Sequence, residues 1–144
     1  MAKYHQSFYE PKNPEKYIGK NTPYFRSSWE LKLMQFFDDR PDVIAWQSEG
    51  MRIPYRNPFT GKPTFYVPDF FVIYENKNKQ RRAEVIEVKP TKHMTEHARS
   101  TYDRASAALN EAKWTTARQW CKQQGFHFRI ITEYDIFRKP GKLK

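Results

Sequence analysis

The first clear pattern of apolar positions predicts a helix over residues 27–40. Three apolar residues lie three, four and seven positions after Glu30 and share one helix face with it: Leu33, Met34 and Phe37. Ser27 and Glu30 have the spacing of a capping box, which places the start of the helix at Ser27. Pro41 disfavours helical geometry in the residue before it, so the helix should end by Arg40.

Strand-like segments follow this helix. Four of them are short apolar runs or alternate between apolar and polar positions: residues 43–47, 51–55, 64–74 and 83–89. Turn-forming residues at 57–63 and a polar stretch at 75–80 separate neighbouring segments. The pattern predicts a meander of three or more strands.

The last part of the chain predicts a long helix followed by one more strand. Residues 91–124 have a helical pattern with a break near Asn110, and they carry an apolar stripe of Trp114, Ala117, Trp120 and Cys121. Gly125 is placed to end the helix in a left-handed cap. Alternating apolar positions over 126–131 predict the strand, and residues 132–135 suit a short helical turn.

The order of these elements is helix, strands, helix, strand, which predicts an α/β fold: a mixed central sheet flanked by helices. Residues 1–25 contain prolines, a glycine and aromatic residues without periodicity. We therefore expect an irregular N-terminal arm whose aromatic side chains pack against the rest of the protein.

Composition changes the picture mainly through charge. The chain has 144 residues, which suits one domain, and a net charge of +10, which favours a polyanionic partner. Cys121 is the single cysteine, so an internal disulfide or a cysteine-based zinc site is excluded and a reducing, intracellular setting is expected. We expect no membrane association, because no apolar run approaches the length of a membrane span and residues 1–8 lack a signal-peptide core.

Two segments carry candidate chemistry, 67–71 and 84–90. Glu87 and Lys89 are two positions apart in a predicted strand, so their side chains point to the same face. If the 64–74 run pairs with this strand through the short loop, Asp69 can lie opposite Glu87. Charges placed among apolar neighbours are costly unless they are compensated, and a divalent metal ion would compensate two carboxylates.

This set of groups suits metal-assisted phosphodiester hydrolysis. Carboxylates and backbone carbonyls are ligands that Mg²⁺ prefers, and the expected ligands are Asp69, Glu87, the carbonyl of Val88 and, directly or through water, Glu30. A lysine beside the metal could orient the attacking water and offset charge on the phosphate. The catalytic set is thus Glu30, Asp69, Glu87 and Lys89, with Mg²⁺ as cofactor and Mn²⁺ as a substitute.

Pro68-Asp69, followed after seventeen residues by Glu87-x-Lys89, resembles the PD-(D/E)XK nuclease signature, to which a preceding helix glutamate such as Glu30 also belongs. The segments that strengthen the likeness are Arg26-Ser27-Ser28-Trp29-Glu30, Ile44-Ala45-Trp46-Gln47-Ser48-Glu49, Ile53-Pro54-Tyr55, Tyr66-Val67-Pro68-Asp69-Phe70 and Ile86-Glu87-Val88-Lys89-Pro90. Together they are similar to the small head completion nucleases of tailed phages and, more distantly, to the N-terminal domain of TnsA-type transposon-end endonucleases.

The resemblance covers about residues 24–135 and implies a restriction-endonuclease-like fold. It divides the chain into an arm (1–25), a nuclease domain (26–137) and a basic C-terminal tail (138–144). It also implies a Mg²⁺-dependent deoxyribonuclease that leaves a 5′-phosphate and a 3′-hydroxyl and acts in head completion and head–tail joining after DNA packaging. The expected partners are DNA and phage head or neck proteins, and the expected location is the host cytoplasm during assembly, with retention in the virion left open.

Two other functions stay open at this point. A structural component of a phage head–tail connector could bind DNA through its positive charge without cutting it. A transposon-end or repair endonuclease could use the same site together with a partner. The sequence indicates no oligomeric state.

Several residues near these segments have simpler interpretations. Glu84 points to the face opposite Glu87 and is expected to be solvated, and Glu49 is expected to make a structural hydrogen bond. His93 and His97 lack a third metal ligand, so a zinc site is disfavoured. The basic residues expected to contact DNA phosphates are Lys77, Lys79, Arg81, Arg82 and Lys92.

Overall fold

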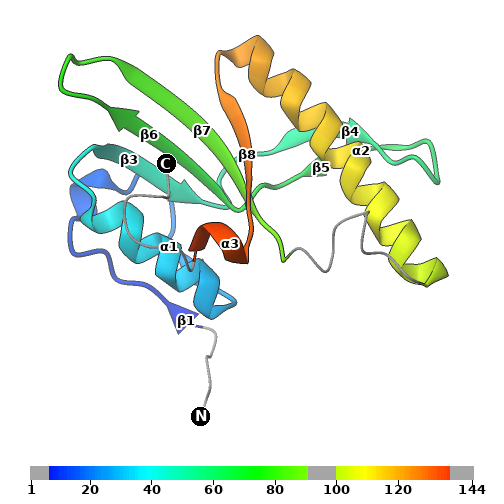
Figure 1. The fold of residues 1–144 in the computed structure, drawn as a ribbon, viewed down its shortest axis with the longest axis horizontal. Coiled ribbons are helices and arrows are strands. Elements are labelled where there is room, and N and C mark those ends of the chain that lie inside the picture. The colour runs from blue at the N-terminus through cyan, green and yellow to red at the C-terminus, as the bar shows by residue number, and fades with distance from the viewer. Residues whose placement is uncertain (1–6, 91–99, 137–144) are drawn as a thin grey trace.

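A four-stranded mixed sheet forms the centre of the protein in a computed structural model that describes residues 7–90 and 100–136 (Figure 1). Its strands are β3 (Val43–Ser48), β6 (Phe70–Glu75), β7 (Arg81–Val88) and β8 (His127–Ile131), in that order across the sheet. The pairs β3–β6 and β6–β7 are antiparallel, and β7–β8 is parallel. The predicted α/β class, with a mixed central sheet flanked by helices, is confirmed.

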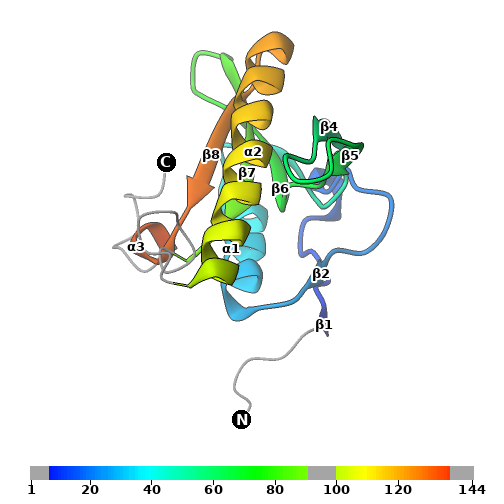
Figure 2. The same cartoon turned by 90° about the vertical axis from the view of Figure 1, so that its right-hand side faces the viewer.

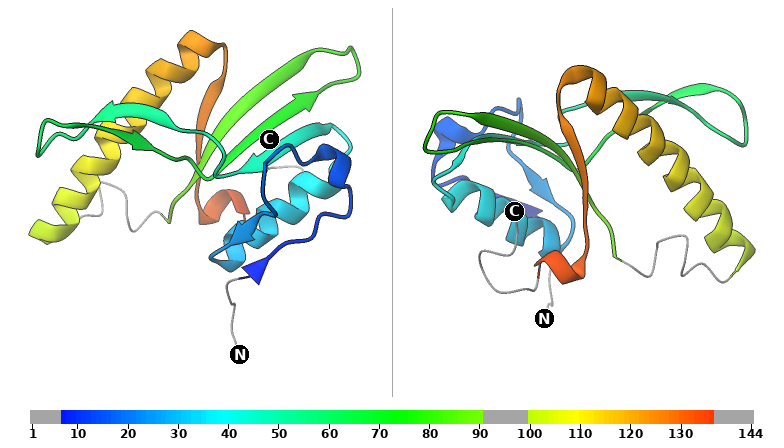
Figure 3. Two further views of the ribbon diagram at one scale, coloured as in Figure 1. Left: turned by 180° about the vertical axis from the view of Figure 1, so that it is seen from behind. Right: turned by 45° about the horizontal axis from the view of Figure 1, so that its top comes forward.

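Helices α1 (Ser28–Asp39) and α2 (Thr101–Gln124) cover opposite faces of this sheet (Figures 1 and 3). On the α1 face, Leu33, Met34 and Phe37 pack with sheet residues such as Phe70 and Ile86. On the α2 face, the main contacts within one buried cluster come from Trp114, Ala117 and Cys121 of the helix and Phe71 and Val85 of the sheet. Because successive strand residues point to opposite faces, each strand contributes to both cores.

The remaining elements are small. Two short sheets are formed by β1 (Ser7–Phe8) with β2 (Tyr24–Phe25), and by β4 (Ile53–Arg56) with β5 (Pro63–Tyr66). A 3₁₀ turn η1 (Pro14–Lys16) and a final helical turn α3 (Glu133–Ile136) complete the described chain. Figure 2 shows β1 and β2 on one side of α1 and α3 on the other.

The helix ends follow the sequence prediction. Ser27 caps α1 by accepting a 3.2 Å hydrogen bond from the Glu30 amide, and Gly125, with φ of 81°, caps α2 in the left-handed conformation. The predicted break near Asn110 is wrong, since α2 runs without interruption from 101 to 124. A single asparagine costs a helix only about 0.7 kcal/mol, which packing of the apolar stripe overcomes. Of the helix predicted over 91–124, residues 91–99 lie outside the described residues.

The predicted strand over 64–74 is two strands. β5 ends at Tyr66 and β6 begins at Phe70. β5 pairs with β4 in a two-stranded sheet, and β6 pairs with β7 in the central sheet. Pro68 stands in the gap, and a proline has no N–H with which to continue a strand ladder. The break therefore places Tyr66 at the end of β5 and Asp69 in the short connection just before β6.

The expectation that aromatic residues of the N-terminal arm pack against the protein is confirmed for Tyr9 and Tyr17, whereas Phe8 is exposed. Tyr9 is buried, and its hydroxyl donates a 2.5 Å hydrogen bond to the carboxylate of Asp38, which has no exposed surface. The same carboxylate accepts hydrogen bonds from the backbone amides of Lys12 and Asn13. Tyr17 forms a parallel bridge with Trp46 at the edge of β3. The arm is thus attached to α1 and to the central sheet.

Glu84 is buried, and its predicted solvent exposure is wrong. The side chain is 2% exposed and lies within 3.0 Å of Arg82 and 3.4 Å of Arg129. The parallel strand β8 brings Arg129 beside β7 on the α1 face, which compensates the buried carboxylate. The pairing joins residues 45 positions apart, so no local pattern could indicate it.

Candidate active site

Asp69 and Glu87 meet where β6 begins and β7 ends. The register pairs Phe70 with Ile86, and the next pair outward brings Asp69 opposite Glu87, as predicted. The carboxylate of Asp69 accepts a 2.7 Å hydrogen bond from the backbone amide of Val88. Glu87 is 8% exposed and faces the α2 side of the sheet together with Val85. Glu87 is therefore fixed by β7, and Asp69, just before β6, is fixed by its hydrogen bond to the Val88 amide.

Two further side chains hold Glu87. Tyr66, at the end of β5, donates its hydroxyl to Oε1 of Glu87 at 2.5 Å. Lys89 places its ammonium 3.6 Å from Oε2 of the same carboxylate, as its same-face spacing predicts. Lys113 of α2 lies 5.9 Å from the centre of the Tyr66 ring and also adds positive charge near Glu87. Both oxygens of Glu87 therefore have a defined partner.

The site holds more negative charge than its surroundings favour. Burial, followed by the charge of Glu87, raises the pKa of Asp69 to about 8. Burial also raises the pKa of Glu87, although the hydrogen bond from Tyr66 and the charges of Lys89 and Lys113 oppose this rise. The pKa of the Tyr66 hydroxyl is raised by burial and by Glu87, so Tyr66 remains a donor. A cation placed between the two carboxylates would relieve their repulsion, and this donor set fits a hard divalent ion.

Glu30 lies at the edge of this site. Burial raises the pKa of its carboxyl, and the charges of Glu49 and Glu87 contribute to the rise. Its Oε1 accepts a 3.0 Å hydrogen bond from the backbone amide of Arg26, so the carboxylate is already engaged. Among residues 7–90 and 100–136, no three acidic, histidine or cysteine side chains are arranged to hold a metal ion. Glu30 therefore does not complete a three-carboxylate ligand set with Asp69 and Glu87 in this structure.

The basic residues of the 77–82 loop lie elsewhere. They are at the opposite end of the β6–β7 hairpin, separated from Asp69 by the six residues of β6, about 20 Å of extended chain. Arg81 pairs with Glu75 at 3.0 Å, Lys79 reaches the same carboxylate at 4.0 Å, and Arg82 pairs with Glu84. The structure does not bring these residues, or Lys77, to the carboxylates. Lys92, His93 and His97 lie outside the described residues.

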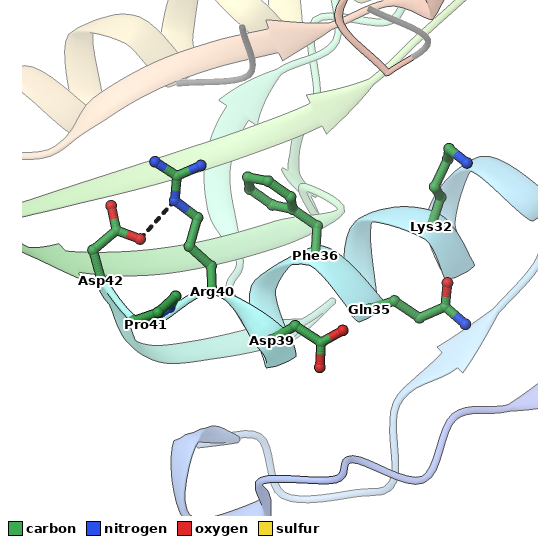
Figure 4. Close-up of a pocket in the computed structure, with 7 residues that line it drawn as sticks. All are labelled: Lys32, Gln35, Phe36, Asp39, Arg40, Pro41 and Asp42. Atoms are coloured by element: carbon green, nitrogen blue, oxygen red, sulfur yellow. Dashed lines mark hydrogen bonds and ion pairs between the residues drawn. The ribbon is translucent and has the colours of Figure 1, made fainter. Parts of the chain in front are cut away.

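A hollow of about 690 Å³ at the C-terminal end of α1 is also separate from this chemistry (Figure 4). Phe36, Arg40 and Asp42 are among its lining residues, and the Arg40 guanidinium binds the Asp42 carboxylate at 2.6 Å. Arg40 also lies 5.2 Å from the centre of the Phe36 ring. None of the four predicted catalytic residues lines this hollow, so its size does not identify the active site.

Sequence reasoning missed three residues that shape the site. Tyr66 and Lys113 support Glu87 from β5 and α2, and Arg26 binds Glu49 at 2.5 Å next to Glu30. Glu49 thus makes the structural contact that was expected of it. Tyr66 lies three residues before Asp69 in the sequence, and this closeness could have indicated that it belongs to the site. No sequence pattern indicates that Lys113 belongs to the site, because its position depends on how α2 packs against the sheet.

Comparison with known proteins identifies the family of this chain. A family model described as TnsA-like endonuclease N terminal matches residues 40–133, which include Asp69, Glu87 and Lys89. The Head completion nuclease of Enterobacteria phage T4 is 33% identical over 136 residues, covering 85% of this chain and 87% of that protein. With a family match over most of its length and a site built from the paired carboxylates and the lysine, the chain belongs to the TnsA-like N-terminal endonuclease family.

Proposed function

We propose that this protein is a divalent-metal-dependent DNA nuclease that acts in the completion of phage heads, in the host cytoplasm during assembly. The observation that supports the chemistry best is the pair Asp69 and Glu87, buried opposite each other with Lys89 beside them. The named function of the phage T4 relative supports the biological role. Head–tail joining remains a prediction within this proposal.

DNA is the substrate that the charge favours. The chain carries +10 at neutral pH, and the phosphate backbone of DNA attracts such a surface without regard to sequence. The sequence contains no recognisable base-reading helix motif, so we predict cleavage with little sequence preference. No described helix is long and apolar enough to cross a membrane.

Each residue of the site has a separate role in the proposed reaction. Asp69, held by the Val88 amide, and Glu87, held by Tyr66, would bind the cation with the carbonyl of Val88 and solvent, and Glu30 would act through water. Bound there, Mg²⁺ would polarise the scissile phosphate and lower the pKa of a water molecule. Lys89 would orient the attacking water and offset negative charge as it develops on the phosphate.

The direct test is nicking and linearisation of supercoiled plasmid. We expect cleavage with Mg²⁺ or Mn²⁺, none with EDTA, and a loss of at least 100-fold in Asp69→Asn, Glu87→Gln and Lys89→Met. Asp39→Asn and Lys12→Met are matched controls, because Asp39 and Lys12 are exposed, pair with each other and make no contact with the carboxylates. If wild type and all variants bind plasmid equally and none cuts it, the protein is a DNA-binding structural component instead.

The biological role needs a separate test. We would complement a phage T4 strain that lacks its head completion nuclease with the wild-type chain and with Asp69→Asn. Catalysis in head completion predicts that the wild type restores infectious particles and that the variant leaves filled heads without tails in electron micrographs. Equal restoration by both would show that docking, rather than cleavage, is the required activity.

A further inference from the structure

A groove of about 650 Å³ lies between the N-terminal segment and the end of β3. Its lining residues are Phe8, the stretch 17–24 and the stretch 47–50. Figure 3 shows, in the view from behind, the N-terminal segment following the edge of β3. The catalytic chemistry described above uses none of these residues.

The groove opens beside the active site. The backbone amide of Glu49, which lines the groove, donates a 3.0 Å hydrogen bond to the carbonyl of Asp69. The Glu49 carboxylate binds the Arg26 guanidinium, and the Arg26 amide binds Glu30. The chain that forms the groove wall is therefore connected by direct hydrogen bonds to two of the predicted catalytic residues.

The wall of the groove carries aromatic rings and one lysine, Lys20, and its one carboxylate, Glu49, is paired with Arg26 just outside the groove. Phe8 is 62% exposed and meets Tyr24 edge to face, with the ring centres 5.0 Å apart. The Arg26 guanidinium lies 5.4 Å from the centre of the Tyr24 ring, and Lys20 adds an exposed ammonium. Ile18 is 49% exposed at the same wall. Exposed rings next to cations are the components from which proteins build sites for unpaired nucleobases.

The shape of the groove is held by the protein core. Tyr17 packs edge to face on buried Trp46, with ring centres 4.7 Å apart, and its hydroxyl accepts a hydrogen bond from the Ser48 amide. The Ile18 amide donates a 2.9 Å hydrogen bond to the Trp46 carbonyl. A Cβ atom at Gly19 would come within 2.4 Å of the Tyr17 hydroxyl, so the chain turns there at a position that favours glycine. These contacts fix the aromatic wall before any ligand binds.

We propose that this groove binds unpaired nucleobases of a DNA strand whose backbone passes the Asp69–Glu87 site. The inference rests on the proposed nuclease function and adds a substrate class to it, namely single-stranded or frayed DNA ends. A nucleic-acid strand is favoured over a protein segment because the groove is joined to the catalytic site by the hydrogen bond from the Glu49 amide to the Asp69 carbonyl, and because Lys20 places an exposed cation on its wall. The rings of Phe8 and Tyr24 would stack on bases, and Lys20 would bind a phosphate.

The test measures binding without cleavage. We would titrate a fluorescein-labelled 12-nucleotide thymidine strand, and separately a 12-base-pair duplex, with the full chain in EDTA and follow fluorescence anisotropy. Stacking of one base predicts that Phe8→Ala weakens single-strand binding about tenfold, with less than a twofold change for the duplex. Phe59→Ala is the matched control, since Phe59 is also 62% exposed but lies in the β4–β5 turn, and it should change neither affinity.

A second measurement locates the strand directly. Irradiating the complex with a strand that contains 5-iodouracil should crosslink Tyr24 or Phe8, identified by mass spectrometry. Equal single-strand affinity of Phe8→Ala and Phe59→Ala, or crosslinks confined to other elements, would overturn the groove assignment even if the protein cuts plasmid. Conversely, Phe8-dependent binding by a protein that cuts no DNA would support the groove and contradict the nuclease. A wild type that cuts duplex but does not bind the single strand leaves the nuclease intact and overturns this inference.

Discussion

The hydroxyl of Tyr66 donates a 2.5 Å hydrogen bond to the carboxylate of Glu87, joining the end of β5 to the end of β7. Neither strand is paired with the other in a sheet. The contact depends on the break at Pro68, which turns the chain from the β4–β5 hairpin into the central sheet. Tyr66 thereby becomes a positioning residue for one of the two carboxylates proposed to bind the metal.

Removing that hydroxyl should shift the pH dependence of cleavage. Burial raises the pKa of Glu87 and the Tyr66 hydrogen bond opposes it, so Tyr66→Phe should raise this pKa further. Fewer molecules then carry the charged carboxylate at neutral pH, and the acidic limb of the rate profile should move to higher pH. Rates measured between pH 5.5 and 9.5 should show the shift, whereas Tyr55→Phe, a buried tyrosine of β4, should not. An unchanged profile with a uniformly lower rate would mean that Tyr66 does not act through Glu87.

Burial of the Asp69 carboxyl, together with charge repulsion from Glu87, should make the metal-free protein less stable as pH rises. The folded pKa of Asp69, raised to about 8 chiefly by burial, lies above the value of about 3.9 in an unfolded chain. The folded state therefore binds the Asp69 proton more tightly, and the free energy of unfolding should fall between about pH 4 and pH 8. Urea unfolding in EDTA should show this decline, and Asp69→Asn should reduce it.

The same repulsion predicts stabilisation by a divalent cation. At pH 8, Mg²⁺ or Mn²⁺ should raise the Tm of the wild type by several degrees, because binding to the folded state adds to its stability. Asp69→Asn should lose this increase and Asp39→Asn should keep it. An equal increase in wild type and Asp69→Asn would place the bound cation elsewhere in the protein.

The features predictable from the sequence are those set by local periodicity. The helix that bears Glu30 and the strand that bears Glu87, with Lys89 directly after it, follow from spacing, and so does the facing of Asp69 and Glu87 once the strands pair. The division of residues 64–74 into two strands was not predicted. Most residues of this segment favour β structure, so a local pattern with one proline still predicts a single strand. The contacts that β8, α2 and the arm make with the rest of the protein could not be predicted, because they depend on tertiary packing and sequence periodicity reports only local structure.

Asp38 should be the main attachment of the N-terminal segment. Burial alone would raise its pKa, but hydrogen bonds from Tyr9, Lys12 and Asn13 outweigh this and hold the pKa below its usual value. Asp38→Ala leaves those donors without their acceptor, which should cost about 2–4 kcal/mol of unfolding free energy in urea. Limited trypsin digestion should then cleave at Arg26 or earlier, faster than in Asp39→Ala, whose partner Lys12 is exposed. Equal stability and digestion of the two variants would show that the segment is held by other contacts.

Two glutamates three positions apart on β7 should respond differently to the same substitution. Glu84 is compensated by Arg82 and Arg129 on the α1 face, whereas Glu87 faces Asp69 on the α2 side. Glu84→Gln leaves Arg129 partly buried beside a neutral partner, so it should lower the unfolding free energy by about 3 kcal/mol and leave the rate per folded molecule within about twofold. Glu87→Gln removes charge repulsion, so it should preserve or increase stability in EDTA while abolishing cleavage. Urea unfolding and plasmid cleavage on the same preparations separate the two effects. If Glu84→Gln abolishes cleavage while remaining folded, or Glu87→Gln keeps it, the division of β7 into a structural face and a catalytic face is wrong.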